Sequence, residues 1–334
     1  MGMALFPREY WKSQSLLGDG KDEGKSSMHR LMSILVPARN EMFLKNTIED
    51  ILSNIEADTE VIAVLDGYVP DRPLPNDPRV RLIHHAISIG QRAASNEAAR
   101  LSTAKYVMKC DAHCAFDKGF DRKLIEPYES GEIDQNTTTI ARMYNLHVFD
   151  WQCRACGDRQ YQGPKVEKCA KCHKSDGFEM VMVWKPRMSR RTDFARFDNT
   201  LHFQYWAKYE KRPESRGDIT DTMSSVGASF FMHRRRFFEI DGLDEQAGFW
   251  GQFGTEVSCK SWLSGGRQVV NKTTWFSHMF RTQQGFSFPY HISGNVQERT
   301  REYSRDFWFN NRWKKQIRPV KWIVDKFAPV PDWD

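Results

Sequence analysis

Two short patterns in the chain bring metal-binding side chains close together, and the first of them is KCDAHCAF. In this pattern Asp111 and His113 are separated by one residue and flanked by Cys110 and Cys114. At the end of a strand, two residues at this spacing can turn towards one ligand once the chain leaves the pleat. A carboxylate oxygen and an imidazole nitrogen suit Mn²⁺ or a related divalent ion, whereas the cysteines fit small apolar core positions. A solvated Asp beside a hydrogen-bonded His gives the same pattern, so both interpretations stay open.

The second pattern lies in WQCRACGDRQYQGPKVEKCAKCHKSDGFEM, where two CxxC pairs are separated by twelve residues. This spacing predicts a closed tetrahedral Zn²⁺ site, and four thiolates leave no open position, so the ion would be structural. A redox pair or four unconnected thiols is the alternative, and His173 is a spare ligand. The expected ligands are Cys153, Cys156, Cys169 and Cys172.

The same segment carries six basic residues, which suit docking of a polyanion but are also what any solvated zinc knuckle needs. They are Arg154, Arg159, Lys165, Lys168, Lys171 and Lys174. Two further segments, 187–197 and 302–327, mix Arg and Lys with Trp and Phe. In such mixtures the basic residues can bind phosphates while the aromatic residues stack on bases. Alternatively, the segments can form amphipathic elements whose aromatic residues face the core.

Composition limits the class of protein. The chain has 334 residues, 40% hydrophobic and 28% charged, which is enough for one large α/β domain or two small ones. It has no long apolar run and no basic-then-apolar start, so we expect neither membrane spanning nor export, and a cytoplasmic protein with reduced thiols. The net charge of +6 permits a polyanionic partner without requiring one.

The elements that must position these residues follow from hydrophobic periodicity. Short apolar runs alternate with segments of helical spacing, which indicates a mostly parallel sheet of Rossmann type. We expect strands at 31–38, 59–67, 80–85 and 105–114, and helices at 46–55 and 95–104. Ligands bind at the carboxyl ends of the strands in such sheets. Residues 37–41, Asp66 and the Asp111/His113 pair each follow an apolar strand, so they should converge on one edge.

The segments SILVPARNE, VIAVLDGY and ASNEAARLSTAKYVMKCDAH resemble the nucleotide half of GT-A glycosyltransferases of the broad family 2 type. ASFFMHRRRFFEIDGLDEQAGFWGQFGTEVSCKSWLSGG resembles the second half, close to the polypeptide N-acetylgalactosaminyltransferases. Those enzymes carry Asp-x-His-Cys and a later His-x-Phe-Arg, matched here by residues 111–114 and 278–281. The resemblance covers about residues 31 to 285 outside one insertion. It implies an α/β GT-A fold, a Rossmann-like nucleotide-diphospho-sugar transferase, with an inserted zinc ribbon.

The resemblance also implies a divalent ion and a donor. Asp111, His113 and His278 would hold Mn²⁺ or Mg²⁺, a Lewis acid that neutralises charge on the departing diphosphate of a UDP-sugar. Asp66 would contact the uridine or ribose.

Five other residues complete the expected donor site. Pro37, Arg39 and Glu41 would line the base pocket, with Arg39 alternatively a surface charge. Arg92 and Arg281 are candidates for the diphosphate, because guanidinium groups bind phosphate bidentately. Arg92 would replace, one turn earlier, the arginine that family 2 places where this chain has Ser95.

The segment after Trp250, where the family has its catalytic carboxylate, departs from the family pattern. Family members often show Glu-Asp or Glu-Asn shortly after Trp-Gly, but here Trp250-Gly251 is followed by Phe253 and Gly254 at those places. Glu256 is the nearest carboxylate. It would act as general base, or it would offset the dipole at the start of a helix over 256–266. Asp244 is the second candidate, and the stereochemistry at the anomeric carbon stays open.

We expect five parts along the chain: a polar lead at 1–30, a nucleotide-sugar-binding half at 31–150, a zinc ribbon at 151–180, an acceptor half at 181–290 and a basic-aromatic tail at 291–334. A UDP-sugar-dependent enzyme and a non-catalytic sugar-nucleotide or nucleic-acid binding module are the two function classes. For the enzyme, the ribbon and the basic charge favour DNA as acceptor, at a hydroxylated base such as 5-hydroxymethylcytosine, a chemistry found in phages. A protein or a surface polysaccharide is the competing acceptor.

Overall fold

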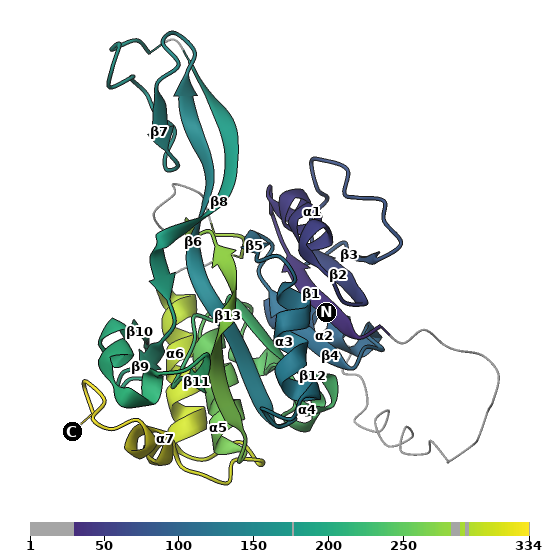
Figure 1. Cartoon of the computed structure of the whole chain (residues 1–334), viewed down its shortest axis with the longest axis vertical. Helices are drawn as coiled ribbons and strands as arrows, with labels where there is room; N and C mark the ends of the chain where they lie inside the picture. Colours follow the sequence, from purple (N-terminus) through teal and green to yellow (C-terminus); the bar gives the residue numbers. More distant parts are fainter. Residues whose placement is uncertain (1–29, 176, 282–287, 291–293, 334) are drawn as a thin grey trace, which may run out of the picture.

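A large mixed sheet runs through the molecule, and its first half is parallel (Figure 1). The computed structural model describes residues 30–175, 177–281, 288–290 and 294–333; the expected lead lies outside them, apart from Arg30. The parallel strands are β1 (Met32–Ala38), β2 (Thr59–Asp66), β3 (Val80–His85) and β4 (Tyr106–Cys110). They stand in the spatial order β4-β1-β2-β3. The four strands expected from the sequence are therefore confirmed.

The central strands β1, β2 and β4 are buried on both faces, which explains their near-continuous apolar sequences. Leu35 and Ile62 point into one core cluster, and Ile34 and Val61 into the other. Helices α1 (Leu44–Asn54), α2 (Gln91–Leu101) and α3 (Phe120–Glu129) connect and flank these strands. Helix α2 begins four residues earlier than the sequence predicts, and this first turn places Gln91 and Arg92 near the site.

The second half of the sheet is mixed and continues directly from β4. Strand β12 (Ser229–His233) runs antiparallel between β4 and the long strand β6 (Thr137–Cys153). Strand β13 (Arg267–His278) follows β6 in parallel, with β11 (Ile219–Asp221) at the edge and β5 (Cys114–Phe116) paired to the end of β13. Helices α4 (Arg234–Glu239) and α5 (Phe253–Leu263) and the short turn η3 (Glu245–Ala247) complete this half.

A β-arm projects from the body and carries the cysteines at its tip (Figure 1). It is formed by β6 and β8 (Phe178–Thr192), which pair antiparallel from Met143↔Thr192 to Cys153↔Phe178, with β7 (Arg159–Tyr161) added near the tip. The expected insertion at 151–180 begins and ends inside these strands. The cysteine segment is thus the end of a continuous hairpin, because its flanking strands extend the main sheet.

The remaining elements cover the lower part of the body. They are β9 (Ala195–Phe197), β10 (Phe203–Tyr205), η1 (Ala207–Lys211), η2 (Pro213–Ser215), α6 (Gly294–Phe309) and α7 (Val320–Lys326). In the C-terminal segment Trp308, Trp313 and Phe327 are buried in the core. Of the two uses expected for these aromatic residues, the structure shows packing. None of the described helices is long and apolar enough to cross a membrane.

Candidate active site

Three candidate metal ligands meet at the carboxyl edge of the sheet. Asp111 follows β4, His113 precedes β5, and His278 ends β13, whose pairing with β5 sets His278 opposite Cys114. The Nε2 atoms of His113 and His278 are 3.0 Å apart, and His278 Nε2 lies 3.2 Å from Asp111 Oδ2. One ligand atom from each of the three residues lies within 4.8 Å of the other two. The structure therefore brings together the two motifs that lie far apart in the sequence.

A buried carboxylate orients one of the imidazoles. His113 Nδ1 lies 2.8 Å from Glu41 Oε2, so the Nε2 atom of the same ring faces Asp111 and His278. Arg281 also forms an ion pair with Glu41. Burial opposes the charged form of Glu41, but His113 and Arg281 outweigh it and hold the pKa of Glu41 below its usual range. Glu41 thus takes the part of an outer carboxylate that fixes a ligand histidine.

The surroundings of Asp111 and His278 favour the protonation states that bind a metal ion: a charged carboxylate and a neutral imidazole. Burial alone would raise the pKa of Asp111, but Lys109 and the two histidines lower it well below its usual range. Burial lowers the pKa of His278 to about 4, so its imidazole is neutral near pH 7. A metal ion needs deprotonated ligands, and Asp111 and His278 are held in that form. Cys110 and Cys114 are fully buried in the core, as the apolar interpretation of the two cysteines expected.

Two residues that the sequence motifs did not reveal hold Asp111 in place. Gln91 Nε2 donates to Asp111 Oδ1 over 2.8 Å, and Lys109 Nζ lies 2.5 Å from the same oxygen. Lys109 is 1% exposed, donates to the carbonyl of Gly227 and lies over the Phe253 ring. A lysine inside the apolar strand YVMKC was the available signal, because a buried lysine needs a partner.

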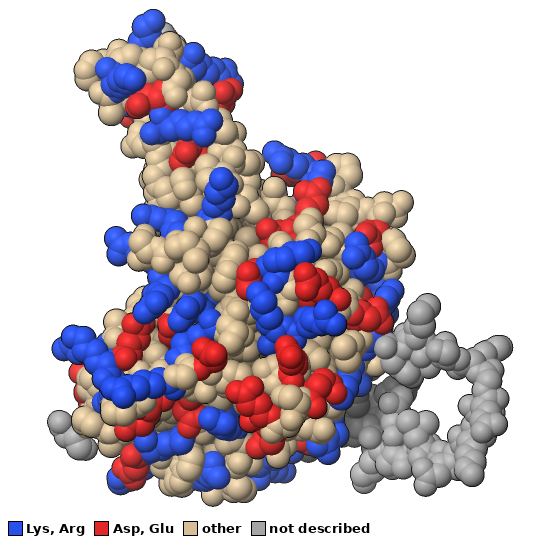
Figure 2. All heavy atoms as spheres, in the orientation of Figure 1, with Lys and Arg blue, Asp and Glu red and all other residues tan. Residues whose placement is uncertain are grey.

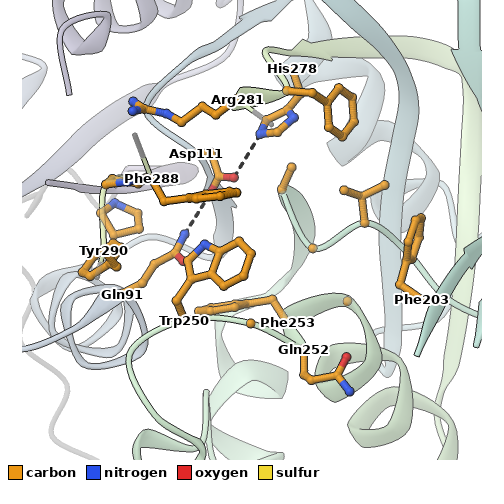
Figure 3. Close-up of a pocket in the computed structure, with 18 of the residues that line it drawn as sticks. Gln91, Asp111, Phe203, Trp250, Gln252, Phe253, His278, Arg281, Phe288 and Tyr290 are labelled. Atoms are coloured by element: carbon orange, nitrogen blue, oxygen red, sulfur yellow. Dashed lines mark hydrogen bonds and ion pairs between the residues drawn. The ribbon is translucent and has the colours of Figure 1, made fainter. Parts of the chain in front are cut away.

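The cluster opens into a cavity of about 380 Å³, which we call the donor cavity. Figure 3 shows Tyr290 and Phe203 at opposite ends, with Trp250 and Phe288 between them, their rings tilted by 58° with centroids 5.4 Å apart. The residues predicted at the base pocket, Pro37, Arg39 and Glu41, line it, as do Arg281 and Trp250. The complete lining also includes Gln91, Lys109, Asp111, His113, His202, Tyr205, Gln252, Phe253, His278, Phe280, Gln297 and Arg301. Its size falls within the range of small-molecule sites.

Asp66 does not reach the donor cavity. This fully buried carboxylate, at the end of β2, accepts hydrogen bonds from Ser88 Oγ (2.8 Å) and from the backbone of Ile89 (2.6 Å) and Gly90 (3.0 Å). These residues lead into α2, so Asp66 fixes the position of Gln91. In this structure Asp66 has a positioning role, and its predicted contact with uridine or ribose stays a prediction.

Arg92 is also placed differently from the prediction. It is 1% exposed, and its Nη1 and Nη2 atoms donate to the carbonyls of Gly248 (2.8 Å) and Gly251 (2.6 Å). Its Nε pairs with Glu256 at 2.8 Å. Each nitrogen of this guanidinium thus has a protein partner, and Arg92 does not line the donor cavity. In this structure Arg92 holds the loop before α5, and its contact with a diphosphate stays a prediction.

Neither candidate general base faces the cavity. Glu256 is 3% exposed, paired with Arg92 and with Lys260 Nζ at 3.3 Å, and it accepts the backbone N–H of Asp244. Asp244 caps η3 and accepts a hydrogen bond from Tyr303 Oη over 2.6 Å. The carboxylates are fixed in a structural network behind the cavity wall. Of the two roles expected for Glu256, these contacts favour the structural one.

The two residues at the usual acidic positions have specific packing roles. Phe253 lies under Arg92, with the guanidinium carbon 4.3 Å from its ring centroid. Gly254 approaches the neighbouring loop so closely that a Cβ atom would stand 1.7 Å from the carbonyl oxygen of Ser225. No side chain fits at residue 254 without moving the backbone.

The four cysteines at the tip of the arm form a second cluster. The Sγ atoms of Cys153 and Cys172 are 3.7 Å apart, and those of Cys156 and Cys169 are 3.6 Å apart. One Sγ from each lies within 4.8 Å of all the others. Around a tetrahedral zinc with Zn–S distances of about 2.3 Å, neighbouring sulfurs stand about 3.8 Å apart, so this geometry fits the ion.

Comparison with known proteins agrees with the fold and the motifs. Residues 33–155 match the glycosyl transferase family 2 model. The structure of GalNAc-T7 with UDP, GalNAc and Mn²⁺ superimposes with a TM-score of 0.57 at 16% identity, covering 90% of this chain and 55% of that one. The fold thus resembles that of GalNAc-T7, and the matched segment resembles glycosyltransferases of family 2.

Within this class the chain is similar to polypeptide N-acetylgalactosaminyltransferases. A putative polypeptide N-acetylgalactosaminyltransferase 13 of Drosophila melanogaster is 24% identical over 77% of this chain and 43% of its own length. Human polypeptide N-acetylgalactosaminyltransferase 13 is 24% identical over 85% of this chain and 42% of its own length. The matches thus span less than half the length of these curated relatives.

Proposed function

We propose that the chain is a metal-dependent glycosyltransferase that uses a UDP-sugar as donor. The observation that carries the proposal is the Asp111, His113 and His278 cluster, which opens into the donor cavity at the carboxyl edge of a GT-A sheet. One carboxylate oxygen and two imidazole nitrogens suit Mn²⁺ or Mg²⁺ better than a soft metal. The GalNAc-T7 structure, which contains UDP and Mn²⁺, supports the same choice of donor and ion.

The residues around the cluster have separate tasks in this proposal. When bound, the ion would act as a Lewis acid on the diphosphate of the donor. Glu41 keeps His113 Nε2 pointed at the ion, and Gln91 and Lys109 occupy Asp111 Oδ1 so that Oδ2 remains for the ion. The side chains of Trp250 and Tyr290 give the donor cavity apolar walls that exclude water.

The carboxylates that line the described part of the donor cavity are Glu41 and Asp111, and both are committed to the metal cluster. With no free carboxylate there, the departing diphosphate oxygen is the base available to take the proton of the acceptor hydroxyl. The acceptor then attacks from the face that the diphosphate leaves. We infer that transfer retains the anomeric configuration, which NMR coupling constants of the product would test.

The activity is tested by UDP release from a panel of UDP-sugars, with and without Mn²⁺. We expect release that requires the ion. The competing function is a non-catalytic sugar-nucleotide or nucleic-acid binding module, which Phe253 and Gly254 at the usual acidic positions favour. UDP-sugar binding without release under any acceptor condition would establish that alternative.

For the acceptor, we propose a hydroxymethylated base in DNA, such as 5-hydroxymethylcytosine. The supporting observation is the arm, whose six basic residues between 154 and 174 are all exposed. The names of the relatives favour a protein acceptor instead, and a surface polysaccharide is a further candidate. Mass spectrometry of hydroxymethylated DNA, protein and glycan acceptors after incubation with each UDP-sugar distinguishes these acceptors by the mass of the added sugar.

We further propose that the cysteine cluster holds a structural zinc ion. The sulfur spacing fits a closed tetrathiolate site, and the ion would tie the two ends of the arm tip together. The cysteines lie at or beyond the tip ends of β6 and β8 (Figure 1), and none of them lines the donor cavity, so we assign the cluster no part in the transfer.

A further inference from the structure

A second cavity, of about 440 Å³, lies where the arm joins the body, and we call it the arm-base cavity. Strand β8 contributes Arg190 and Arg191 to its wall, and η1 contributes Glu210. Tyr205 and Phe280 line both this cavity and the donor cavity, so the two are neighbours across these side chains. A polymer that presents one unit to the donor cavity would continue into the arm-base cavity.

The charges around the arm-base cavity leave a positive excess. Asp193 is held by Arg142 through two hydrogen bonds of 2.7 and 2.8 Å, which compensates its charge. Arg191 pairs with Glu210 at 3.0 Å. Arg190 is exposed and has no ionic partner within the described part of the chain. One uncompensated guanidinium therefore stands at the rim of the cavity.

This positive charge continues outward along the arm. Between residues 180 and 192, strand β8 has four basic residues and no acidic one. Lys185, like Arg190, is exposed and without an ionic partner among the described residues. Figure 2 shows basic side chains at the base of the arm and again at its tip. The basic residues of β8, Lys185, Arg187, Arg190 and Arg191, form what we call the β8 stripe.

Exposed aromatic side chains accompany the stripe. Tyr205 is 54% exposed at the junction of the two cavities, and Tyr161 is 37% exposed, with the guanidinium carbon of Arg187 4.6 Å from its ring centroid. Aromatic surfaces beside a basic track are how proteins bind single-stranded nucleic acids, because bases stack while phosphates pair with Arg and Lys. An anionic polysaccharide would use the charges but would gain less from exposed rings.

From these features we propose that the arm-base cavity and the β8 stripe bind a single-stranded segment of nucleic acid and lead it into the donor cavity. The proposal rests on the proposed function, since it names the path of that enzyme's acceptor. The phosphates lie along the β8 stripe, and a base stacks on Tyr205 before the next one enters the donor cavity. Single-stranded or unpaired regions are preferred, because a base inside a duplex must first be taken out of the stack.

The test is binding of a fluorescein-labelled oligothymidylate to the whole protein, followed by fluorescence anisotropy over a series of salt concentrations. The double variant Lys185→Glu/Arg190→Glu should weaken binding by about tenfold or more and lower the salt slope by roughly one to two units. Tyr205→Ala should weaken binding by roughly tenfold through lost stacking. The control is Lys314→Glu, an exposed residue that lines neither cavity, and it should bind as the wild type does.

The outcomes separate this proposal from the proposed function, because oligonucleotide binding needs neither donor nor Mn²⁺. If the wild type releases UDP from a UDP-sugar but does not bind the oligonucleotide at low salt, the path is wrong while the enzyme stands. If heparin binds as tightly as the oligonucleotide and Tyr205→Ala changes neither, the surface serves an anionic polysaccharide instead. Binding that weakens equally in the control and the double variant also overturns the proposal.

Discussion

Both oxygens of Asp111 are held in place, so that only Oδ2 is available to a metal ion. Gln91 and Lys109 share Oδ1, and Oδ2 faces His278. The motif predicted the ligands from their spacing, but not these two partners. Lys109 is buried, so removing the negative charge beside it would leave an ammonium group without compensation. Mutations of Asp111 must therefore keep the shape of the side chain.

We predict that Asp111→Asn or His278→Ala abolishes Mn²⁺-dependent UDP release. Thermal unfolding should change little in His278→Ala, whereas Asp111→Asn should also lower the melting temperature, because the buried Lys109 loses its counter-charge. Asparagine still accepts a hydrogen bond from Lys109 but binds the ion far more weakly. Asp117→Asn is the matched control, since Asp117 lies outside the cluster and pairs with Lys123. Full Mn²⁺-dependent release by either cluster variant would show that the ion is held elsewhere.

Glu256 allows a structural and a catalytic role to be distinguished. Glu256→Gln should lower the free energy of unfolding by about 3 kcal/mol, because it leaves the charges of Arg92 and Lys260 buried without their partner. The rate of UDP release per folded molecule should stay near that of the wild type. Urea unfolding and an activity assay on the same samples measure both, with the exposed Glu302→Gln as control. A large loss of rate with unchanged stability would restore Glu256 as the base.

Among the elements, those buried on both faces were predictable from the sequence. Strands β1, β2 and β4 read as apolar runs, and their alternation with helices predicts the parallel pairing that the structure shows. The arm was not predictable, because β8 is half-exposed and its pairing with β6 joins residues on either side of the cysteine segment. Nor could periodicity show the pairing of Arg92 with Glu256, which are 164 positions apart.

The zinc proposal belongs to the arm tip. We predict about one zinc per chain, resistant to mild chelation, because closed tetrathiolate sites bind tightly. Cys153→Ser should release the zinc and unfold the tip, while His173→Ala should keep it, since four thiolates already complete the site. Elemental analysis and hydrogen exchange of residues 151–180 measure the two effects. A zinc-free wild type with a protected tip would mean that the cysteines have another role.

The whole molecule consists of a body that holds the donor cavity and an arm that reaches away from it (Figure 1). The root of the arm is part of the body, because Leu146 and Phe149 of β6 pack with Met279 next to the metal cluster. Beyond the Trp151↔Met180 pair, the two strands pair with each other, and Gln162 reaches back to the root of the arm, where it accepts a hydrogen bond from Val148 N and donates to the carbonyl of Leu146. Among the described residues, the hydrogen bonds of the tip thus extend to the root of the arm but not to the donor cavity.

We predict that replacing residues 152–179 by an Asn-Gly turn leaves the body folded and able to release UDP. The turn suits the two antiparallel strands that it would join. Circular dichroism and UDP release measure the effect, and the apparent KM for DNA should rise as the basic tip is lost. Loss of the fold would show that the tip stabilises the body, contrary to its packing.

The contact at Gly254 bears on how this sequence could have evolved. Relatives of the family 2 type often place a carboxylate or an amide after the Trp-Gly pair, but here the neighbouring carbonyl of Ser225 occupies the space that any such side chain would need. A single codon change from Gly254 to Asp would displace the backbone before it supplied a carboxylate. An acidic side chain at this position therefore requires accompanying changes in the 225–227 loop.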